Sequence, residues 1–225
     1  MKLQYLGHSA FILEKENFKA IFDPFLSGNP NSAIKPNEIK GLTHIFITHG
    51  HGDHIGDAIE LARENQALII SNAEIVDYFS EHGLKTHGMS IGGRFKFNFG
   101  TVKMTPALHG SAIPTSKGPR NGGNPGGFVV EIEGKKIYHA GDTGLTMDMQ
   151  LLEEESIDVA LLPIGGNYTM DIHDAVRAVS FIKPKVTVPM HYDTFPVIEA
   201  DPKEFKEKNI WSETKILDIG ETMEL

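Results

Sequence analysis

Alternating apolar and polar positions open the chain and predict three short strands, at residues 2–6, 10–13 and 19–22. Residues 14–17 are polar and predict the hairpin turn between the second and third strands. The third strand is expected to end at Asp23-Pro24, because proline interrupts regular pairing. Residues 27–36, rich in glycine, asparagine and proline, predict a surface loop.

From residue 44 onward, apolar runs typical of strands alternate with the wider apolar spacing of helices. Strands are predicted at residues 44–48, 67–70, 94–99, 102–106, 128–132, 135–139, 159–163 and 186–190, and helices at residues 55–64, 73–82, 147–155, 172–182 and 202–208. The glycine-rich residues 117–127 are interpreted as a mobile active-site loop, with a domain linker as the alternative. Both halves of the chain show strand pairs followed by alternating strands and helices. This order favours two mixed sheets face to face with helices outside, in one domain of residues 1–225.

The composition is that of a packed globular protein, with 40% hydrophobic and 23% charged residues among 225. A formal net charge of -9 disfavours a nucleic-acid partner. No cysteine is present, which excludes disulfides and thiolate metal ligands. The chain starts without a signal-type apolar stretch and has no run near the ~18 apolar residues of a membrane span. A cytoplasmic protein without a membrane partner is expected, and its oligomeric state stays open.

Four side chains that bind metals lie within six residues, directly after the apolar strand at residues 44–48. Histidine and aspartate suit divalent ions of the Zn, Fe, Ni or Mn type. Glycines between them let the backbone turn so that the ligands converge. The alternative, a solvated loop that is merely rich in histidine, does not explain the glycine-spaced pattern. The four candidate ligands are His49, His51, Asp53 and His54.

Further candidate ligands follow three other predicted strands. His109, Asp142 and His191 each come directly after an apolar run. One cluster of four side chains does not complete the coordination of two ions, so distant residues are needed. Each of the three, taken alone, is more often a surface residue; together with the cluster they indicate a second group of metal ligands.

These motifs resemble the metallo-β-lactamase superfamily over nearly the whole chain. The signature Thr48-His49-x-His51-x-Asp53-His54 is preceded by Asp23 and followed by His109, Gly141-Asp142-Thr143 and His191, in the order of that superfamily. Within it, the chain resembles the UPF0173 group of metal-dependent hydrolases, and it is more distantly similar to ascorbate-6-phosphate lactonases. The motifs for the UPF0173 group are Leu6-Gly7-His8-Ser9, Asp23-Pro24-Phe25, Gly123-Asn124-Pro125 and Pro189-Met190-His191-Tyr192.

The resemblance implies an α/β fold of four layers, αββα, in which two mixed sheets are flanked by helices. It also implies two divalent ions. Zn²⁺ is favoured, and Mn²⁺, Fe²⁺ and Ni²⁺ are the alternatives. Asp23 matches a position that supports the ligand loop without touching metal. The implied ligands are His49, His51 and His109 for the first ion, Asp53, His54 and His191 for the second, and Asp142 as the bridge.

The expected activity is hydrolysis of an ester, lactone or phosphoester of a small, anionic molecule by water that the ions activate. We expect Asp53, Asp142 and His8 to act in catalysis. Asp53 would accept or relay a proton, and His8 would donate a hydrogen bond to substrate or a proton to the leaving group. The alternative for His8 is a histidine satisfied near a strand end.

Three further residues allow a functional and a plain structural interpretation. Arg120 is either a ligand for an anionic substrate group or, more often for such a residue, a solvated loop arginine. His173 follows Asp171, a good N-cap residue, and is interpreted as exposed at a helix start. Tyr192 either points into a cleft or packs as an ordinary aromatic residue.

Four other functions compete with small-molecule hydrolysis. The first is oxidation at iron, above all by an iron-dependent sulfur dioxygenase, since imidazole-rich sites accept iron. The second is metal binding without chemistry. The third is a phosphodiesterase or ribonuclease acting on nucleic acid, which the acidic charge disfavours. The fourth is a true β-lactamase, which is disfavoured because those enzymes are normally exported.

Overall fold

A computed structural model describes residues 1–32 and 34–225. The described residues form two compact units, each built from separate segments of the chain. The first unit comprises residues 1–90, 110–125 and 218–225, and the second comprises residues 91–109 and 126–217. Because the chain passes between the units four times, no single cut in the chain separates them. The expectation of one domain over residues 1–225 stays a prediction.

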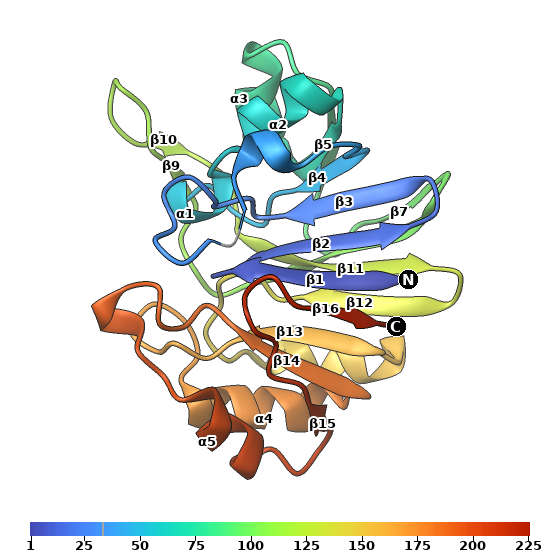
Figure 1. The fold of residues 1–225 in the computed structure, drawn as a ribbon, viewed down its shortest axis with the longest axis vertical. Coiled ribbons are helices and arrows are strands. Elements are labelled where there is room, and N and C mark those ends of the chain that lie inside the picture. Colours follow the sequence, from blue (N-terminus) through green and yellow to red (C-terminus); the bar gives the residue numbers. More distant parts are fainter. Residues whose placement is uncertain (33) are drawn as a thin grey trace. The chain divides into compact units, whose positions relative to one another are not determined.

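The first unit is a seven-stranded mixed sheet with the strand order β16-β1-β2-β3-β4-β5-β6 (Figure 1). Strands β1 to β3 and β16 pair antiparallel, whereas β3 to β6 pair parallel. A short hairpin, β9-β10, belongs to the same unit. The bounds are β1 Lys2–Gly7, β2 Ala10–Lys15, β3 Phe18–Phe22, η1 Pro36–Glu38, β4 His44–Phe46, α1 Gly52–Ile55, α2 Ala58–Asn65, β5 Leu68–Asn72, α3 Ala73–Glu81, β6 Thr86–Met89, β9 Ala112–Ile113, β10 Arg120–Asn121 and β16 Thr222–Glu224.

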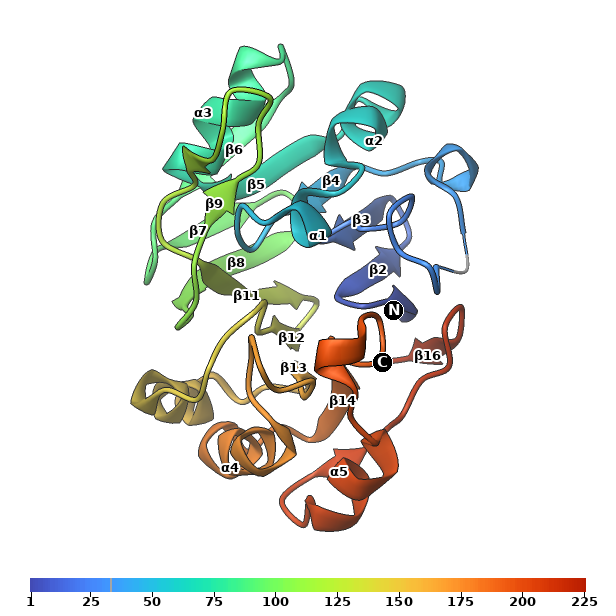
Figure 2. The same cartoon turned by 90° about the vertical axis from the view of Figure 1, so that its left-hand side faces the viewer.

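Helices α2 and α3 lie beside strands β4, β5 and β6 of this sheet (Figures 1 and 2). α3 starts at Asn72, whose side chain accepts a hydrogen bond from the Ile75 amide. It buries Ile75 and Phe79, four residues apart on one face. These side chains belong to a buried apolar cluster with Leu6, Ile45 and Ile69 from the strands. Burial of this apolar face against the sheet stabilises a helix too short to persist alone.

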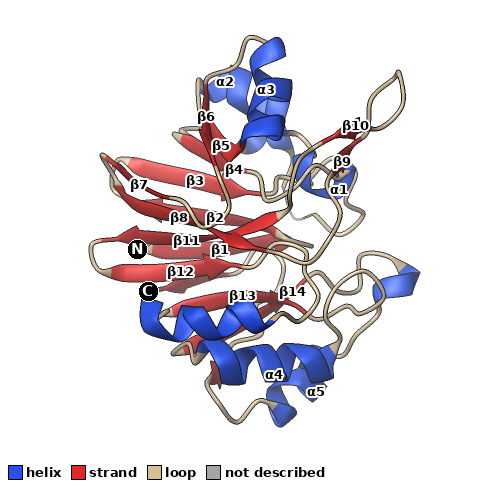
Figure 3. Ribbon diagram, turned by 180° about the vertical axis from the view of Figure 1, so that it is seen from behind, coloured by secondary structure: helices blue, strands red, loops and turns tan. Residues whose placement is uncertain are grey.

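The second unit is another seven-stranded mixed sheet, with the order β15-β14-β13-β12-β11-β8-β7. Its helices α4 and α5 lie side by side (Figure 3). α4 buries Ala175, Ala178, Val179 and Ile182, the spacing of one helical face. The bounds are β7 Arg94–Phe97, β8 Gly100–Pro106, β11 Gly126–Ile132, β12 Lys135–His139, η2 Met147–Glu155, β13 Val159–Pro163, α4 Ile172–Ile182, β14 Val186–Met190, η3 Pro196–Ile198, α5 Pro202–Lys208 and β15 Glu213–Thr214.

The predicted fold class, an α/β protein with two mixed sheets and flanking helices, is confirmed. Most predicted elements are present within two residues of their expected ends, including the hairpin turn between β2 and β3. Among the described residues, no helix is long and apolar enough to cross a membrane. The predicted surface loop at residues 27–36 contains Ala33, which lies outside the described residues.

Four predictions of local structure need correction. The helix expected at residues 55–64 is two helices, α1 and α2, separated at Gly56. The helix at residues 147–155 is a 3₁₀ helix. The strand expected at residues 44–48 ends at Phe46. The loop expected at residues 117–127 contains β10, which pairs with β9, and the first residues of β11.

Gly56 breaks the predicted helix because the chain turns there in a conformation that side chains rarely adopt. Its φ is 41° and its ψ is -123°. A Cβ at this position would lie 2.2 Å from the Pro24 carbonyl oxygen and 2.7 Å from the Phe25 Cα, both of them backbone atoms. The glycine therefore lets the turn after α1 approach the segment that follows β3.

We expect Gly56→Ala to lower the melting temperature clearly more than Gly83→Ala, a matched control. Gly83 also has a positive φ, 71°, but no atom lies within 4 Å of the added methyl group. The control change therefore meets only the penalty of a left-handed backbone conformation. This lowers the free energy of unfolding by about 1 kcal/mol and the melting temperature by roughly 2–4 °C. Thermal unfolding followed by circular dichroism measures both variants. Equal shifts would contradict the close approach described here.

Candidate metal centre

Parallel strands of the first unit bring several sequence-predicted residues to one edge of its sheet. Strands β1, β3 and β4 run in the same direction, so their carboxyl ends lie at the same edge. His8 follows β1, and Asp23 follows β3. The ligand loop, defined here as residues 47–54, follows β4 and carries His49, His51, Asp53 and His54.

Asp23 anchors the ligand loop through hydrogen bonds to its carboxylate. It is fully buried, and its φ of 40° is unusual for an aspartate. Its carboxylate accepts hydrogen bonds from the Thr48 amide (2.9 Å to Oδ1) and from the Thr48 hydroxyl (2.7 Å to Oδ2). The His54 Nδ1 lies 2.8 Å from the same Oδ2. These contacts are the support that the family resemblance implies for Asp23.

The Asp23 carboxylate also decides where two histidines carry their protons. An ionised carboxylate only accepts hydrogen bonds, so the Nδ1 of His54 carries the hydrogen and its Nε2 has the lone pair. The Thr48 hydroxyl has one hydrogen, which goes to Asp23. Thr48 therefore accepts from the His49 Nδ1 at 3.0 Å, and the His49 Nε2 also has a lone pair. A free lone pair is what an imidazole needs to bind a metal ion.

The next histidine of the loop presents a nitrogen to the same place. The His51 Nδ1 lies 3.1 Å from the His49 Nε2. Two ligand nitrogens on one tetrahedral zinc ion, each about 2.05 Å from it, lie roughly 3.3 Å apart. Gly50 stands between them without a side chain, because a Cβ there would lie 2.9 Å from the Ser111 carbonyl oxygen. The Gly50 amide donates to the Ser111 hydroxyl at 3.0 Å.

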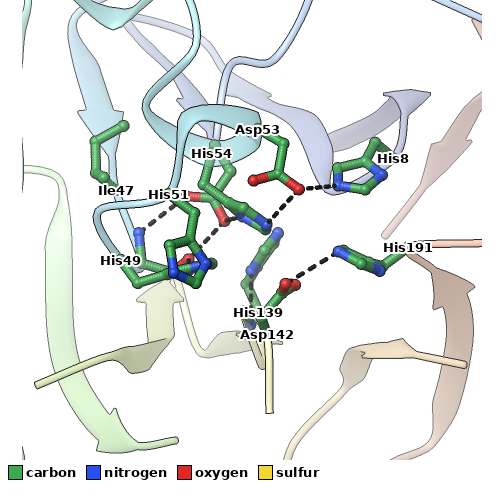
Figure 4. A network of polar contacts seen from close by, with 12 residues as sticks. His8, Ile47, His49, His51, Asp53, His54, His139, Asp142 and His191 are labelled. Atoms are coloured by element: carbon green, nitrogen blue, oxygen red, sulfur yellow. Dashed lines mark hydrogen bonds and ion pairs between the residues drawn. The ribbon is translucent and has the colours of Figure 1, made fainter. Parts of the chain in front are cut away.

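Asp53 and His54 occupy the one-turn helix α1, and their polar atoms face each other. The His54 Nε2 lies 3.9 Å from the Asp53 Oδ2. His8 approaches the same oxygen with its Nε2, at 3.2 Å (Figure 4). The Asp53 side chain is 29% exposed, whereas those of His8 and His54 are fully buried.

The second unit gathers its own predicted residues at one edge of its sheet. Strands β8, β12, β13 and β14 run in the same direction, with β11 antiparallel between β8 and β12. His109 follows β8, Asp142 follows β12 and His191 follows β14. Three loops that are far apart in the sequence therefore meet beyond the carboxyl ends of these strands.

Asp142 lies close to two histidines of the second unit, His109 and His191. Its Oδ2 is 3.0 Å from the His191 Nε2 and 3.5 Å from the His109 Nε2, and its side chain is 3% exposed. The contact between His191 and Asp142 is drawn in Figure 4. Such separations suit a carboxylate oxygen and imidazole nitrogens bound to the same ions. The three residues, defined here as the Asp142 cluster, have the donor types of a metal site, and Asp142 lies 3.0 Å and 3.5 Å from the two imidazoles.

The backbone around the Asp142 cluster is held by polar contacts that the sequence analysis missed. The Gly141 amide donates to the His139 Nδ1 at 3.1 Å, within a fully buried part of the unit. The Leu108 amide donates to the Thr143 hydroxyl at 2.9 Å, which ties the segment before His109 to the segment after Asp142. His191 has a φ of 56°, a conformation that costs free energy in a residue other than glycine.

Of the three residues with two open interpretations, Arg120 and His173 contact residues other than the candidate ligands, whereas Tyr192 directly follows one of them. Arg120 donates to the Glu81 carboxylate at 2.6 Å, and this hydrogen bond holds the pKa of Glu81 below its usual value. His173 is 83% exposed on its side chain, in the first turn of α4, whose N-cap is Asp171 as predicted. Tyr192 is half-buried beside His191.

Comparisons with known proteins show the family of the chain. The family model described as "Beta-lactamase superfamily domain" matches residues 19–192. A UPF0173 metal-dependent hydrolase of Alkaliphilus metalliredigens is 60% identical over 222 residues, covering 98% of either chain. The chain belongs to the UPF0173 group of the metallo-β-lactamase superfamily. The resemblance stated from the motifs is thereby confirmed.

Other members of the superfamily match the whole chain. A UPF0173 metal-dependent hydrolase of Pelotomaculum thermopropionicum is 49% identical over 230 residues, covering 100% of both chains. Among solved structures, a metallo hydrolase of Ignicoccus hospitalis is 39% identical, with a TM-score of 0.91, covering 100% of this chain and 98% of the other. Membership of this group identifies the chain as a metal-dependent hydrolase.

Thr48 is the first residue of the signature in the sequence, but the sequence analysis gave it no role of its own. Its signal was visible, because it directly precedes the first ligand of the cluster. A hydroxyl residue at that point has the reach to join the buried Asp23 to His49, but only the folded geometry shows that it does. His139 carried no comparable signal, since a histidine in a strand pattern is indistinguishable from any half-polar position.

We expect Thr48→Val to weaken zinc binding by about 10–100-fold, because the hydroxyl that orients His49 is lost. Thr48→Ser keeps the hydroxyl and should bind within a few-fold of the original protein. Competition of the metal-free proteins against a coloured chelator measures the affinities. Equal affinity in the valine and serine variants would contradict the relay from Asp23 through Thr48 to His49.

Proposed function

We propose that this hydrolase cleaves an ester, lactone or phosphoester bond of a small molecule with two divalent ions, held jointly by the ligand loop and the Asp142 cluster. The observation that carries the proposal is the placement of Asp142, whose Oδ2 faces the Nε2 atoms of both His109 and His191. A carboxylate between two imidazoles has the position that a ligand shared by two ions requires.

The proposed ligand sets follow from the two groups. His49, His51 and His109 bind the first ion, and Asp53, His54 and His191 bind the second, with Asp142 shared. Neither group alone offers enough donors for two ions, since the ligand loop has four and the Asp142 cluster has three. The donor set of five imidazoles and two carboxylates suits Zn²⁺, with Mn²⁺, Fe²⁺ and Ni²⁺ as alternatives.

Two bound ions would supply a water molecule acidified toward neutral pH and a Lewis acid for the oxygen of the scissile group. Asp53 would accept a proton from that water and pass it on. Its side chain is 29% exposed, whereas those of Asp23 and Asp142 are 0% and 3% exposed. Only a carboxylate that solvent and substrate reach is able to exchange protons with them.

The other expectations about this hydrolase stay predictions. A small anionic substrate, a cytoplasmic location and the absence of a nucleic-acid partner rest on the sequence alone. The iron-dependent alternative is tested by loading the protein with either Fe²⁺ or Zn²⁺ and comparing the two forms. Oxygen consumption with thiol substrates by the Fe²⁺-loaded protein, together with no hydrolysis by the Zn²⁺-loaded protein, would overturn the hydrolytic proposal.

We expect the purified protein, loaded with Zn²⁺, to contain two ions per chain and to hydrolyse members of a panel of lactones, carboxylic esters and phosphodiesters. Asp142→Ala should reduce the metal content to one ion or fewer and lower kcat/KM by at least about 10³-fold, since the shared ligand is lost. Elemental analysis and hydrolysis assays measure both effects.

Asp148→Ala is the matched control, because Asp148 is an exposed aspartate only six residues further along the chain. It should keep both the metal content and the activity. Full activity with normal metal content in Asp142→Ala would refute the shared-ligand scheme.

A further inference from the structure

We propose that His8 is a positioning residue for Asp53 rather than a group that reacts with substrate. This inference rests on the proposed function, in which Asp53 binds an ion and handles a proton. The carrying observation is the contact between the His8 Nε2 and the Asp53 Oδ2 at 3.2 Å, within the first unit. The His8 side chain is fully buried.

The direction of this hydrogen bond follows from the chemistry of the carboxylate. An ionised Asp53 only accepts hydrogen bonds, so the hydrogen lies on the His8 Nε2. At this contact, His8 therefore acts as a donor that fixes the carboxylate, and its complete burial separates the imidazole from substrate.

The turn between β1 and β2 is built to hold His8 in this position. β1 ends at Gly7 and β2 begins at Ala10, so His8 is the first residue of a two-residue turn. Its φ of 55° is left-handed, which histidine tolerates better than most residues. The Tyr5 hydroxyl donates to the His8 carbonyl oxygen at 3.3 Å, and the Phe25 ring meets the imidazole edge-on with the ring centroids 5.6 Å apart.

Asp53 needs support from outside its own helix. α1 spans only Gly52–Ile55, and no side chain caps its first turn. One helical turn is too short to be stable by itself. The two polar residues of α1 are instead held from neighbouring strand ends, His54 by Asp23 after β3 and Asp53 by His8 after β1. Figure 4 shows His8 and His54 on either side of the Asp53 carboxylate.

The test compares His8→Leu with His8→Gln. The glutamine side-chain amide has a donor at about the reach of an imidazole Nε2, whereas leucine has none. Both replacements meet the same left-handed backbone, so their difference isolates the hydrogen bond. His173→Leu, at an exposed histidine, is the control for losing an imidazole.

The readout is stepwise Zn²⁺ affinity, measured by chelator competition on the metal-free proteins, with their circular dichroism spectra confirming that each is folded. His8→Leu should weaken one of the two binding steps by about 10–100-fold, as the loss of a residue that orients a ligand does. His8→Gln should recover most of that affinity, and His173→Leu should bind like the original protein.

Three results would overturn the proposal. His8→Leu with unchanged zinc affinity but reduced kcat would make His8 a donor to substrate. His8→Gln as weak as His8→Leu, together with an altered visible spectrum of the Co²⁺-loaded protein, would make His8 a ligand. An original protein that binds no divalent ion would refute the proposed function itself and remove the basis for positioning Asp53.

Discussion

The buried carboxylate of Asp23 is the interaction on which the first group of ligands depends. It holds the Thr48 amide, the Thr48 hydroxyl and the His54 ring at distances of 2.7–2.9 Å. Burying a charge without partners costs several kcal/mol, so the three donors are required for Asp23 to be there at all. Asp23 sets the tautomer of His54 by a direct contact and that of His49 through the Thr48 hydroxyl.

In each unit, the shared direction of several strands brings the candidate ligands to one edge of the sheet. In the first unit β1, β3 and β4 end at one edge, and in the second unit β8, β12 and β14 do the same. Every ligand in the proposed sets follows the end of one of these strands, and none lies on a strand itself. Such loops vary in length and side chain without disturbing the sheets, so the fold accommodates many substrates around one arrangement of ligands.

Much of this architecture was predictable from apolar spacing. One face of each helix or strand is buried, so apolar residues recur with the period of that element. α4 was predicted with its correct ends, since four buried positions repeat at helical spacing and Asp171 caps the start. The break at Gly56 was not predictable in the same way. The apolar pattern continues across it, and the reason for the break is the approach of Pro24, which is 32 residues away in the sequence.

The candidate ligands were likewise predictable, and the residues that orient them were not. Metal-binding side chains at strand ends have a distinctive chemical type, whereas Thr48 and His139 have ordinary types in ordinary positions. Their importance lies in single hydrogen bonds, to Asp23 and from Gly141. Pairing of this kind depends on atoms brought together by the fold, and no spacing rule along the chain encodes it.

Burial distinguishes three aspartates to which the family resemblance gives different roles. Asp23 is 0% exposed and accepts hydrogen bonds from the Thr48 amide and hydroxyl, which make it a structural anchor. Asp142 is 3% exposed and lies close to two imidazoles, and we propose that it binds cations there. Asp53 keeps 29% of its side chain exposed, which leaves one carboxylate able to exchange a proton with water. In the function that we propose, one residue type at three depths serves as anchor, as shared ligand and as proton acceptor.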